Sequence, residues 1–244
     1  MDYLKAIVLG IVEGLTEFLP VSSTGHLIIG NELMGVNPEL PQWRTFLFVS
    51  QLGAIAAVVI FFWKDLWRQT FVAKVADWRN HIMVKLIIGF APAVVAGLAL
   101  NDFMEEHLEN NPLAVAGALI VGAIAMELIE RRFRKDREMT IDDVTYKQAF
   151  LIGLAQCLSI WPGMSRAACT IMGGLIVGLS PRIAAQFSFY LAIPTMLGAA
   201  GYRLLKYHDE LSVDTIGVVL TGTGVAFLVA LGVVAWFLPY VQKH

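Results

Sequence analysis

Two acidic side chains near the start of the chain are the first candidates for chemistry. Glu13 and Glu17 are four residues apart, so a helix would present both carboxylates on one face. Apolar residues surround both positions, and two carboxylates in a membrane are costly unless another group compensates their charge. A divalent cation, an arginine or a shared proton would do so. The alternative is a water-exposed helix face at the edge of the bilayer.

A stretch rich in hydrogen-bond donors follows directly after Pro20. It contains Ser22, Ser23, Thr24, Gly25 and His26. Backbone N–H groups near the start of a helix bind anions, and a histidine can carry a proton near neutral pH. The stretch therefore predicts an anion site in which His26 moves a proton, with a purely structural histidine as the alternative.

A second candidate is an arginine in the middle of another apolar segment. A charged side chain there is costly and marks a candidate functional site. The planar guanidinium of Arg166 suits bidentate phosphate binding, and the nearby hydroxyls of Ser165 and Thr170 could add donors. An ion pair with Glu13 or Glu17 is the alternative. The two interpretations are compatible, because a phosphate or a metal could join all three groups.

Two glutamines, Gln51 and Gln156, are neutral polar groups within apolar helices. Hydrogen bonding between helices is the default interpretation, and Gln51 is also kept as a candidate substrate contact. The sequence contains neither a Gly-x-x-x-x-Gly-Lys loop for nucleotide hydrolysis nor a His-Glu-x-x-His zinc motif. Cys157 and Cys169 lie in apolar runs and are expected to be buried thiols without a disulfide.

The composition indicates that these groups belong to a membrane protein. Hydrophobic residues make up 57% of the 244 residues and charged residues only 16%, and the mean hydropathy is +0.66. Soluble domains contain about 45–50% apolar and about 25% charged residues. The net charge of −2 suggests no nucleic-acid partner.

Five sustained apolar segments are each close to the length of about 20 residues that an α-helix needs to cross the hydrocarbon core. They run at about 46–63, 85–100, 113–129, 183–202 and 216–238. Two further apolar segments, 4–35 and 149–179, are interrupted at 20–25 and 162–166. A polar break is tolerated in lipid only where protein or a water-filled cavity surrounds it. The sequence therefore predicts an all-α, polytopic membrane protein with two re-entrant helix hairpins.

The two halves of the chain resemble each other. Pro20 and Pro162 lie 142 positions apart, and the serines three positions after them share that offset. Phe-rich runs follow both breaks and lead into helices that end in aromatic and basic residues, and glycines around Gly89 and Gly222 start the next helices. Broken segments at matching positions of two halves predict inverted-topology repeats with the site at their interface.

We expect one transmembrane domain over residues 1–244. Repeat one covers about 1–130, and repeat two covers about 148–244. The second repeat has no counterpart of segment 113–129. We expect that either the chain is truncated or that helix has been lost.

Loop charges predict the orientation of the chain. The loops 64–85 and 131–147 are basic, whereas loop 101–112 has no Lys or Arg. The charged residues concerned are Lys64, Arg68, Lys74, Arg79, Lys85, Arg131, Arg132, Arg134, Lys135, Arg137 and Lys147 on the basic side, and Asp102, Glu105, Glu106 and Glu109 on the acidic side. The positive-inside rule places the basic loops in the cytoplasm and the acidic loop outside. The two hairpins then enter the membrane from opposite faces.

Two segments resemble the signatures of a known family. Residues 13–26 resemble the first signature of the undecaprenyl-pyrophosphate phosphatases, also called bacitracin-resistance proteins, and residues 161–170 resemble the second. The segments 51–53 and 187–189 are also similar to family segments. The resemblance covers nearly the whole chain up to the missing last helix.

The resemblance implies an integral membrane enzyme that hydrolyses undecaprenyl pyrophosphate to undecaprenyl phosphate, which recycles the carrier lipid for peptidoglycan synthesis. It implies a multi-pass protein of the bacterial inner membrane, with a site that opens to the periplasmic side. It also implies a divalent metal ion, with Mg or Ca as the expected choices. A homodimer is a possible assembly.

Roles for individual residues also follow from the resemblance. Glu17 and Glu13 would hold the metal or position water. Either Ser23 or His26 would be the nucleophile or the acid–base group, unless a water attacks. Three side chains of the second signature would bind the pyrophosphate: Arg166, Ser165 and Thr170. A transporter or lipid flippase is the competing function, because inverted repeats and broken helices are also typical of transporters.

Overall fold

The computed structural model describes residues 1–37, 40–72, 81–104, 107–108, 111–135, 137–206 and 213–243. Within these residues every regular element is helical. The α-helices are α1 (Asp2–Thr16), α2 (Ser23–Leu33), α3 (Pro41–Phe61), α4 (Trp63–Trp67), α5 (Ile82–Met104), α6 (Pro112–Phe133), α7 (Tyr146–Gln156), α8 (Arg166–Ile176), α9 (Pro181–Lys206) and α10 (Val213–Lys243). Short π- or 3₁₀-helical segments are Arg68–Val72, Ile141–Asp143 and Cys157–Ile160.

Five of the described helices are long and apolar enough to cross a membrane by length and composition. They are Pro41–Phe61 in α3, Ile82–Leu100 in α5, Leu113–Phe133 in α6, Pro181–Lys206 in α9 and Ile216–Val241 in α10. Each overlaps one of the five apolar segments recognised in the sequence. The prediction of an all-α, polytopic membrane protein is therefore confirmed.

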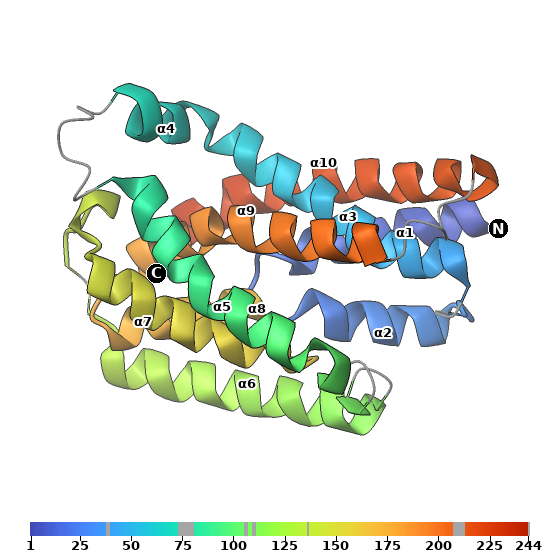
Figure 1. Cartoon of the computed structure of the whole chain (residues 1–244), viewed down its shortest axis with the longest axis horizontal. Helices are drawn as coiled ribbons and strands as arrows, with labels where there is room; N and C mark the ends of the chain where they lie inside the picture. Colours follow the sequence, from blue (N-terminus) through green and yellow to red (C-terminus); the bar gives the residue numbers. More distant parts are fainter. Residues whose placement is uncertain are drawn as a thin grey trace.

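Each of the two interrupted segments forms a pair of short helices joined by a loop. α1 contacts α2, and α7 contacts α8; Figure 1 shows the first pair in one half of the bundle and the second pair in the other. The first loop turns at Ser22, whose φ is 65°, and the second turns at Gly163, whose φ is 95°. Both pairs have the shape of a hairpin. Their re-entrant position in a bilayer stays a prediction.

Contacts between the two halves follow a matched pattern. α1 packs against α10, and α7 packs against α5. At both contacts glycines let the backbones approach: a Cβ on Gly10 would collide with the carbonyl group of Gly222, and a Cβ on Gly153 would collide with that of Gly89. Such contacts between small residues are typical of helix packing in membranes. The pattern favours inverted repeats, whose existence and boundaries stay a prediction.

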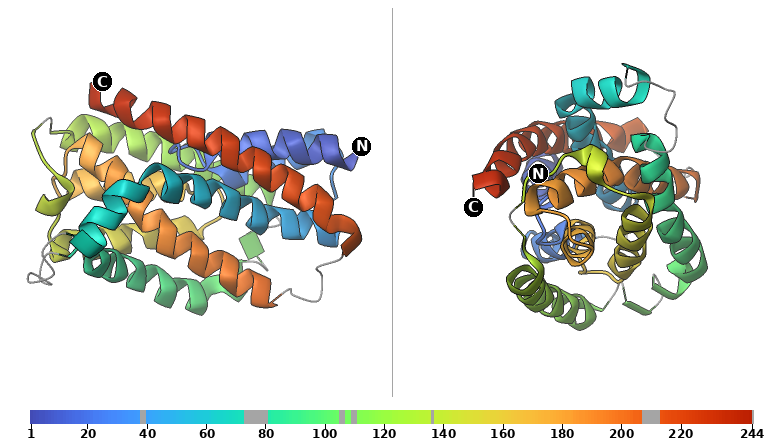
Figure 2. Two further views of the ribbon diagram at one scale, coloured as in Figure 1. Left: turned by 90° about the horizontal axis from the view of Figure 1, so that it is seen from above. Right: turned by 90° about the vertical axis from the view of Figure 1, so that its left-hand side faces the viewer.

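The helices differ in how deeply they lie in the bundle. α5 and α6 lie at the periphery, as the end-on view in Figure 2 shows, and only 11% of the apolar stretch of α6 is buried. In a bilayer such apolar faces contact lipid. α9 is 61% buried over its apolar stretch, and Phe187, Phe189 and Tyr190 are fully enclosed. α9 is thus the central helix on which the hairpins can be fixed.

The basic segments that follow α3 and α6 lie at the same end of the bundle in Figure 1. Lys85, which we expected in a loop, lies inside α5 instead. It is buried there because its Nζ donates to the carbonyl oxygen of Asp142 at 2.8 Å. Of the loop charges on which the orientation was predicted, Lys74, Arg79, Glu105, Glu106 and Glu109 lie outside the described residues. The orientation relative to the cytoplasm therefore stays a prediction.

Candidate active site

Three of the candidate residues meet where the loops of the two hairpins face each other. Nη2 of Arg166 lies 3.1 Å from Oε1 of Glu17, across 149 positions of sequence. Oγ of Ser23 donates to the other carboxylate oxygen, Oε2, at 2.6 Å. The side chain of Glu17 is 7% exposed and that of Arg166 is 11% exposed. The ion pair expected as one of the two interpretations of Arg166 is therefore present, in a buried cluster that both hairpins build.

The ends of helices position these three groups. Glu17 follows the last residue of α1, whereas Ser23 and Arg166 are the first residues of α2 and α8. The first N–H groups of a helix have no acceptor within the helix, and the helix dipole favours negative charge beside them. Ser22 and Ser165, the N-cap residues, accept one such N–H bond each. The starts of two helices thus make the surroundings of Glu17 suitable for an anion.

α9 and the first hairpin hold the guanidinium of Arg166 in place. Nη1 donates to the carbonyl oxygen of Ser188 at 3.3 Å, and Nη2 lies 3.6 Å from Sδ of Met196. Cζ lies 5.9 Å from the centroid of the Phe18 ring, which is within cation–π range. Nε is buried and has no hydrogen-bond partner among the described residues. A positioned donor therefore remains for an acceptor such as a phosphate oxygen.

The hydroxyls near Arg166 take part in local structure. Oγ of Ser165 accepts from the N–H of Ala168 at 3.2 Å. Oγ1 of Thr170 donates to the carbonyl oxygen of Arg166 at 2.9 Å and lies 2.6 Å from Oγ of Ser188. These contacts tie α8 to α9 and so fix the guanidinium. A direct contact of Ser165 or Thr170 with a substrate stays a prediction.

The donor-rich residues of the first hairpin make two kinds of contact: Ser23 contacts Glu17, whereas Ser22 and His26 make contacts within the hairpin. Oγ of Ser22 accepts from the N–H of Gly25 at 3.4 Å, and Nδ1 of His26 lies 2.8 Å from the carbonyl oxygen of Ser22. His26 is exposed, and in the described part of the chain no hydrogen bond joins it to Glu17 or Ser23. The structure therefore brings Ser23 to the carboxylate and does not bring His26 there. The proton-transfer role of His26 stays a prediction.

Glu13 lies one helical turn before Glu17 and is fully buried. Among the described residues no donor reaches either of its carboxylate oxygens. When both are ionised, two neighbouring buried carboxylates beside one arginine leave a net negative charge, which a divalent cation or a shared proton would compensate. No third Asp, Glu, His or Cys completes a cluster in the described chain. Mg²⁺ often uses one or two carboxylates together with water and substrate phosphates, so the residues present fit such an ion.

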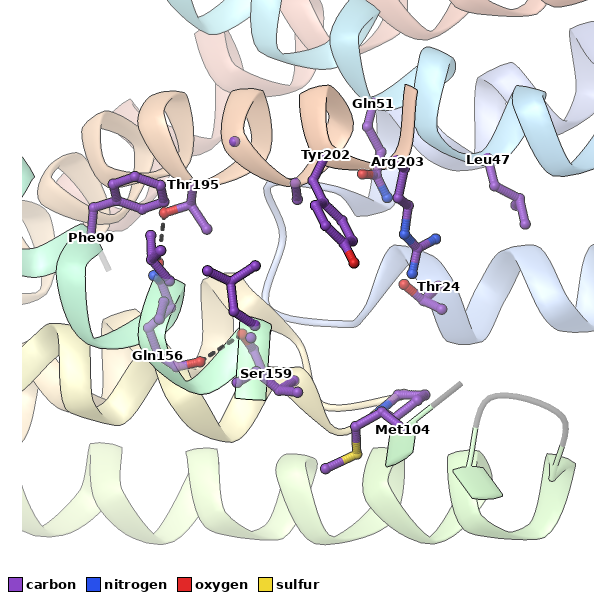
Figure 3. Close-up of a pocket in the computed structure, with 18 of the residues that line it drawn as sticks. Thr24, Leu47, Gln51, Phe90, Met104, Gln156, Ser159, Thr195, Tyr202 and Arg203 are labelled. Atoms are coloured by element: carbon purple, nitrogen blue, oxygen red, sulfur yellow. Dashed lines mark hydrogen bonds between the residues drawn. The ribbon is translucent and has the colours of Figure 1, made fainter. Parts of the chain in front are cut away.

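A cavity of about 410 Å³ adjoins the first hairpin. Thr24 and Gln51 line one part of it, and Gln156, Thr195 and Arg203 contribute further polar groups. Figure 3 shows Thr24, Gln51 and Arg203 close together, with Gln156 and Thr195 at a distance from them. Apolar residues of α5 and α9 form much of the remaining wall. Two residues predicted to contact substrate therefore line this cavity, whereas Glu17, Ser23 and Arg166 are not among its lining residues.

Some residues of the site were not singled out from the sequence. Ser188 and Met196 contact Arg166, and Arg203 lines the cavity. Ser188 lies in the segment 187–189, which stood out in the sequence only by its similarity to a family segment, and its signal is a hydroxyl between two phenylalanines in a mostly apolar helix. Met196 carries no signal in the sequence, because one methionine in an apolar run has no distinguishing feature.

Known proteins are similar to this chain along nearly its whole length. The sequence model of the family described as "Bacitracin resistance protein BacA" matches residues 6–244. A protein of Caldanaerobacter subterraneus subsp. tengcongensis named undecaprenyl-diphosphatase is 46% identical over 242 residues, which cover 99% of this chain and 88% of the relative. Undecaprenyl-diphosphatase 1 of Oenococcus oeni is 44% identical and covers 99% of this chain and 89% of the relative.

A further relative from Novosphingobium aromaticivorans, also named undecaprenyl-diphosphatase, is 44% identical over 98% of this chain and 89% of the relative. Such identity extends over nearly the full length of the chain. Glu17, Ser23 and Arg166 lie within the residues that the family model matches. This chain therefore belongs to the bacitracin resistance protein BacA family.

Proposed function

We propose that this protein hydrolyses undecaprenyl pyrophosphate to undecaprenyl phosphate and inorganic phosphate. The observation that carries the proposal is the buried carboxylate of Glu17, which accepts a hydrogen bond from Ser23 and pairs with Arg166. A hydroxyl, a base and a guanidinium that can bind phosphate are the groups that such a hydrolysis requires. The names of relatives that are more than 40% identical support the choice of substrate.

In the proposed mechanism Ser23 is the nucleophile and Glu17 is its base. Glu17 takes the proton of Oγ as this oxygen attacks the terminal phosphorus, and the bond from that phosphorus to the bridging oxygen breaks. The lipid monophosphate leaves with the proton, and the phosphoryl group stays on Ser23. A water then attacks the phosphorus and passes a proton to the serine oxygen, which releases inorganic phosphate.

Arg166 stabilises the charge that builds on the phosphoryl oxygens in both steps. Phosphoryl transfer depends mainly on positioning and on charge stabilisation. The bonds of Arg166 to α9 fix the guanidinium before substrate binds, so little reorganisation accompanies the reaction. Its unpartnered Nε is a donor for a phosphoryl oxygen.

The proposal includes the place of the reaction in the cell. We expect the site to open to the periplasmic side of the bacterial inner membrane, where the released monophosphate returns to peptidoglycan synthesis. The apolar walls of the cavity and the apolar outer faces of α5 and α6 suit an isoprenoid chain that stays in contact with lipid.

Phosphate release in detergent tests the function directly. Purified protein mixed with undecaprenyl pyrophosphate is expected to release phosphate over many turnovers, at about 1–10³ per second. Detergent removes any transmembrane gradient, so a transporter or flippase would bind the lipid without turnover. Binding of the lipid without release of phosphate would reject the hydrolase and favour a carrier.

Removal of divalent cations is expected to stop the reaction. Mg²⁺ or Ca²⁺ held by Glu13 and Glu17 would supply positive charge to the phosphoryl oxygens. Dialysis against EDTA should lower phosphate release by about 100-fold or more, because several kcal/mol of charge stabilisation is lost. Added MgCl₂ or CaCl₂ should restore it, and Glu13→Gln should raise the concentration of cation needed for half-maximal rate. Unchanged turnover in EDTA would remove the metal from the mechanism.

A further inference from the structure

The cavity that Thr24 and Gln51 line contains one charged side chain among its lining residues. This residue is Arg203, in the last turn of α9. Figure 3 shows its guanidinium directed toward Thr24, with Gln51 on the same side of the cavity. Thr24 is the residue after Ser23 in the first turn of α2, whereas Ser23 itself, Glu17 and Arg166 are not among the residues that line the cavity.

A second observation indicates that the cavity takes a ligand with acceptor oxygens. Gln156 lines the same cavity and is 1% exposed. Its Oε1 accepts from Oγ1 of Thr195 at 3.3 Å, but its Nε2 has no hydrogen-bond partner among the described residues. A buried donor without an acceptor is costly. A polar ligand that extends from Arg203 into this more distant part of the cavity would supply the acceptor.

The charge of the proposed substrate also calls for more than one cation. A pyrophosphate carries at least two negative charges near neutral pH, whereas the positive charge of Arg166 is already shared with Glu17. An arginine is suited to a second phosphate group, because its planar fork can donate to two oxygens at once. The hydroxyl of Thr24 and the amide of Gln51 offer neutral donors beside it.

We propose that Arg203, together with Thr24 and Gln51, binds the pyrophosphate head of the lipid in this cavity. The inference rests on the proposed function and extends it, since it adds a substrate-binding residue that is outside the cluster of Glu17, Ser23 and Arg166. Arg203 acts mainly on the affinity for substrate. The chemical step belongs to the buried cluster.

The test compares two substitutions at the same end of one helix, Arg203→Gln and Lys206→Gln. Arg203 and Lys206 both lie in the last turn of α9, but only Arg203 lines the cavity. Arg203→Gln should raise KM for undecaprenyl pyrophosphate about tenfold, the loss of about 1.4 kcal/mol of binding, and should change kcat less than about twofold. Lys206→Gln should leave both constants unchanged, and Arg203→Lys should recover part of the affinity.

Inorganic pyrophosphate as a competitive inhibitor provides an independent probe of the same contact. Its inhibition constant should rise about tenfold in Arg203→Gln and stay unchanged in Lys206→Gln. Wild-type KM in Arg203→Gln would overturn the inference, as would a fall in kcat together with a lower unfolding temperature. The proposed function is judged separately, by turnover of the wild-type protein and of Lys206→Gln.

Discussion

Replacement of Glu17 by glutamine is expected to lower kcat for release of phosphate by about 10³-fold or more. A general base contributes about 10²–10⁴-fold to rate, and Glu17 also accepts the bond from Ser23 and pairs with Arg166. Glutamine keeps the size of the side chain and can still accept from Ser23, but it cannot take a proton. The measurement is phosphate release in detergent at saturating lipid, beside the unfolding temperature of each variant.

Glu127→Gln is the matched control for this experiment. Glu127 lies on the peripheral helix α6, its side chain is 59% exposed, and it pairs with Arg131 at 2.5 Å. The same chemical change there should leave turnover within about twofold of wild type, because exposed ion pairs contribute about 1 kcal/mol or less to stability. If Glu17→Gln folds normally and keeps more than a tenth of wild-type turnover, Glu17 is not the base.

Replacement of Arg166 should produce the second large effect. Arg166→Lys keeps a positive charge but loses the planar fork that reaches both Glu17 and the carbonyl group of Ser188. We expect a loss of about 10²-fold in kcat/KM. Arg166→Ala should lose about 10³-fold or more, since removal of one fixed donor to a developing oxyanion alone costs about 10²–10³-fold. Arg131→Ala, on the exposed face of α6, serves as the control.

A double variant separates the structural role of the ion pair from its catalytic role. Arg166→Ala alone leaves the charge of Glu17 buried without its partner, which should lower the unfolding temperature. Addition of Glu17→Gln removes that charge and should recover much of the stability, but none of the activity. Recovery of activity in the double variant would show that Arg166 only compensates the charge of Glu17 and does not act on substrate.

The membrane fold follows from local properties of the sequence. Long apolar runs predict spanning helices because a helix satisfies its own backbone hydrogen bonds, so composition and length suffice. The breaks were also predictable, since the chain turns close to Pro20 and at Gly163. Both cysteines are free thiols, as expected, but only Cys169 is buried, whereas Cys157 is partly exposed. Lys85 was misplaced because a lysine near a helix end can be buried when a distant carbonyl group, here that of Asp142, accepts its bond.

Candidate residues could be recognised from the sequence because charge inside an apolar segment is costly and needs a reason. Glu13, Glu17 and Arg166 stood out on this ground alone. The hydroxyl that serves the carboxylate could not be recognised, since hydroxyls are common in membrane helices and serve several purposes. In the structure Thr170 fixes α8 to α9 and His26 contacts the carbonyl oxygen of Ser22, whereas Ser23 donates to the carboxylate.

By itself, the sequence determined the all-α membrane architecture, the two breaks and the charged residues that demand compensation. Only the tertiary structure decided that Arg166 pairs with Glu17, that Ser23 is the hydroxyl on that carboxylate, and that Arg203 faces the cavity. The physical reason is the separation in sequence of the residues that each property depends on. Helix formation and membrane insertion depend on residues that are close together along the chain. An ion pair across 149 positions depends on how helices pack, which contacts between distant small residues set.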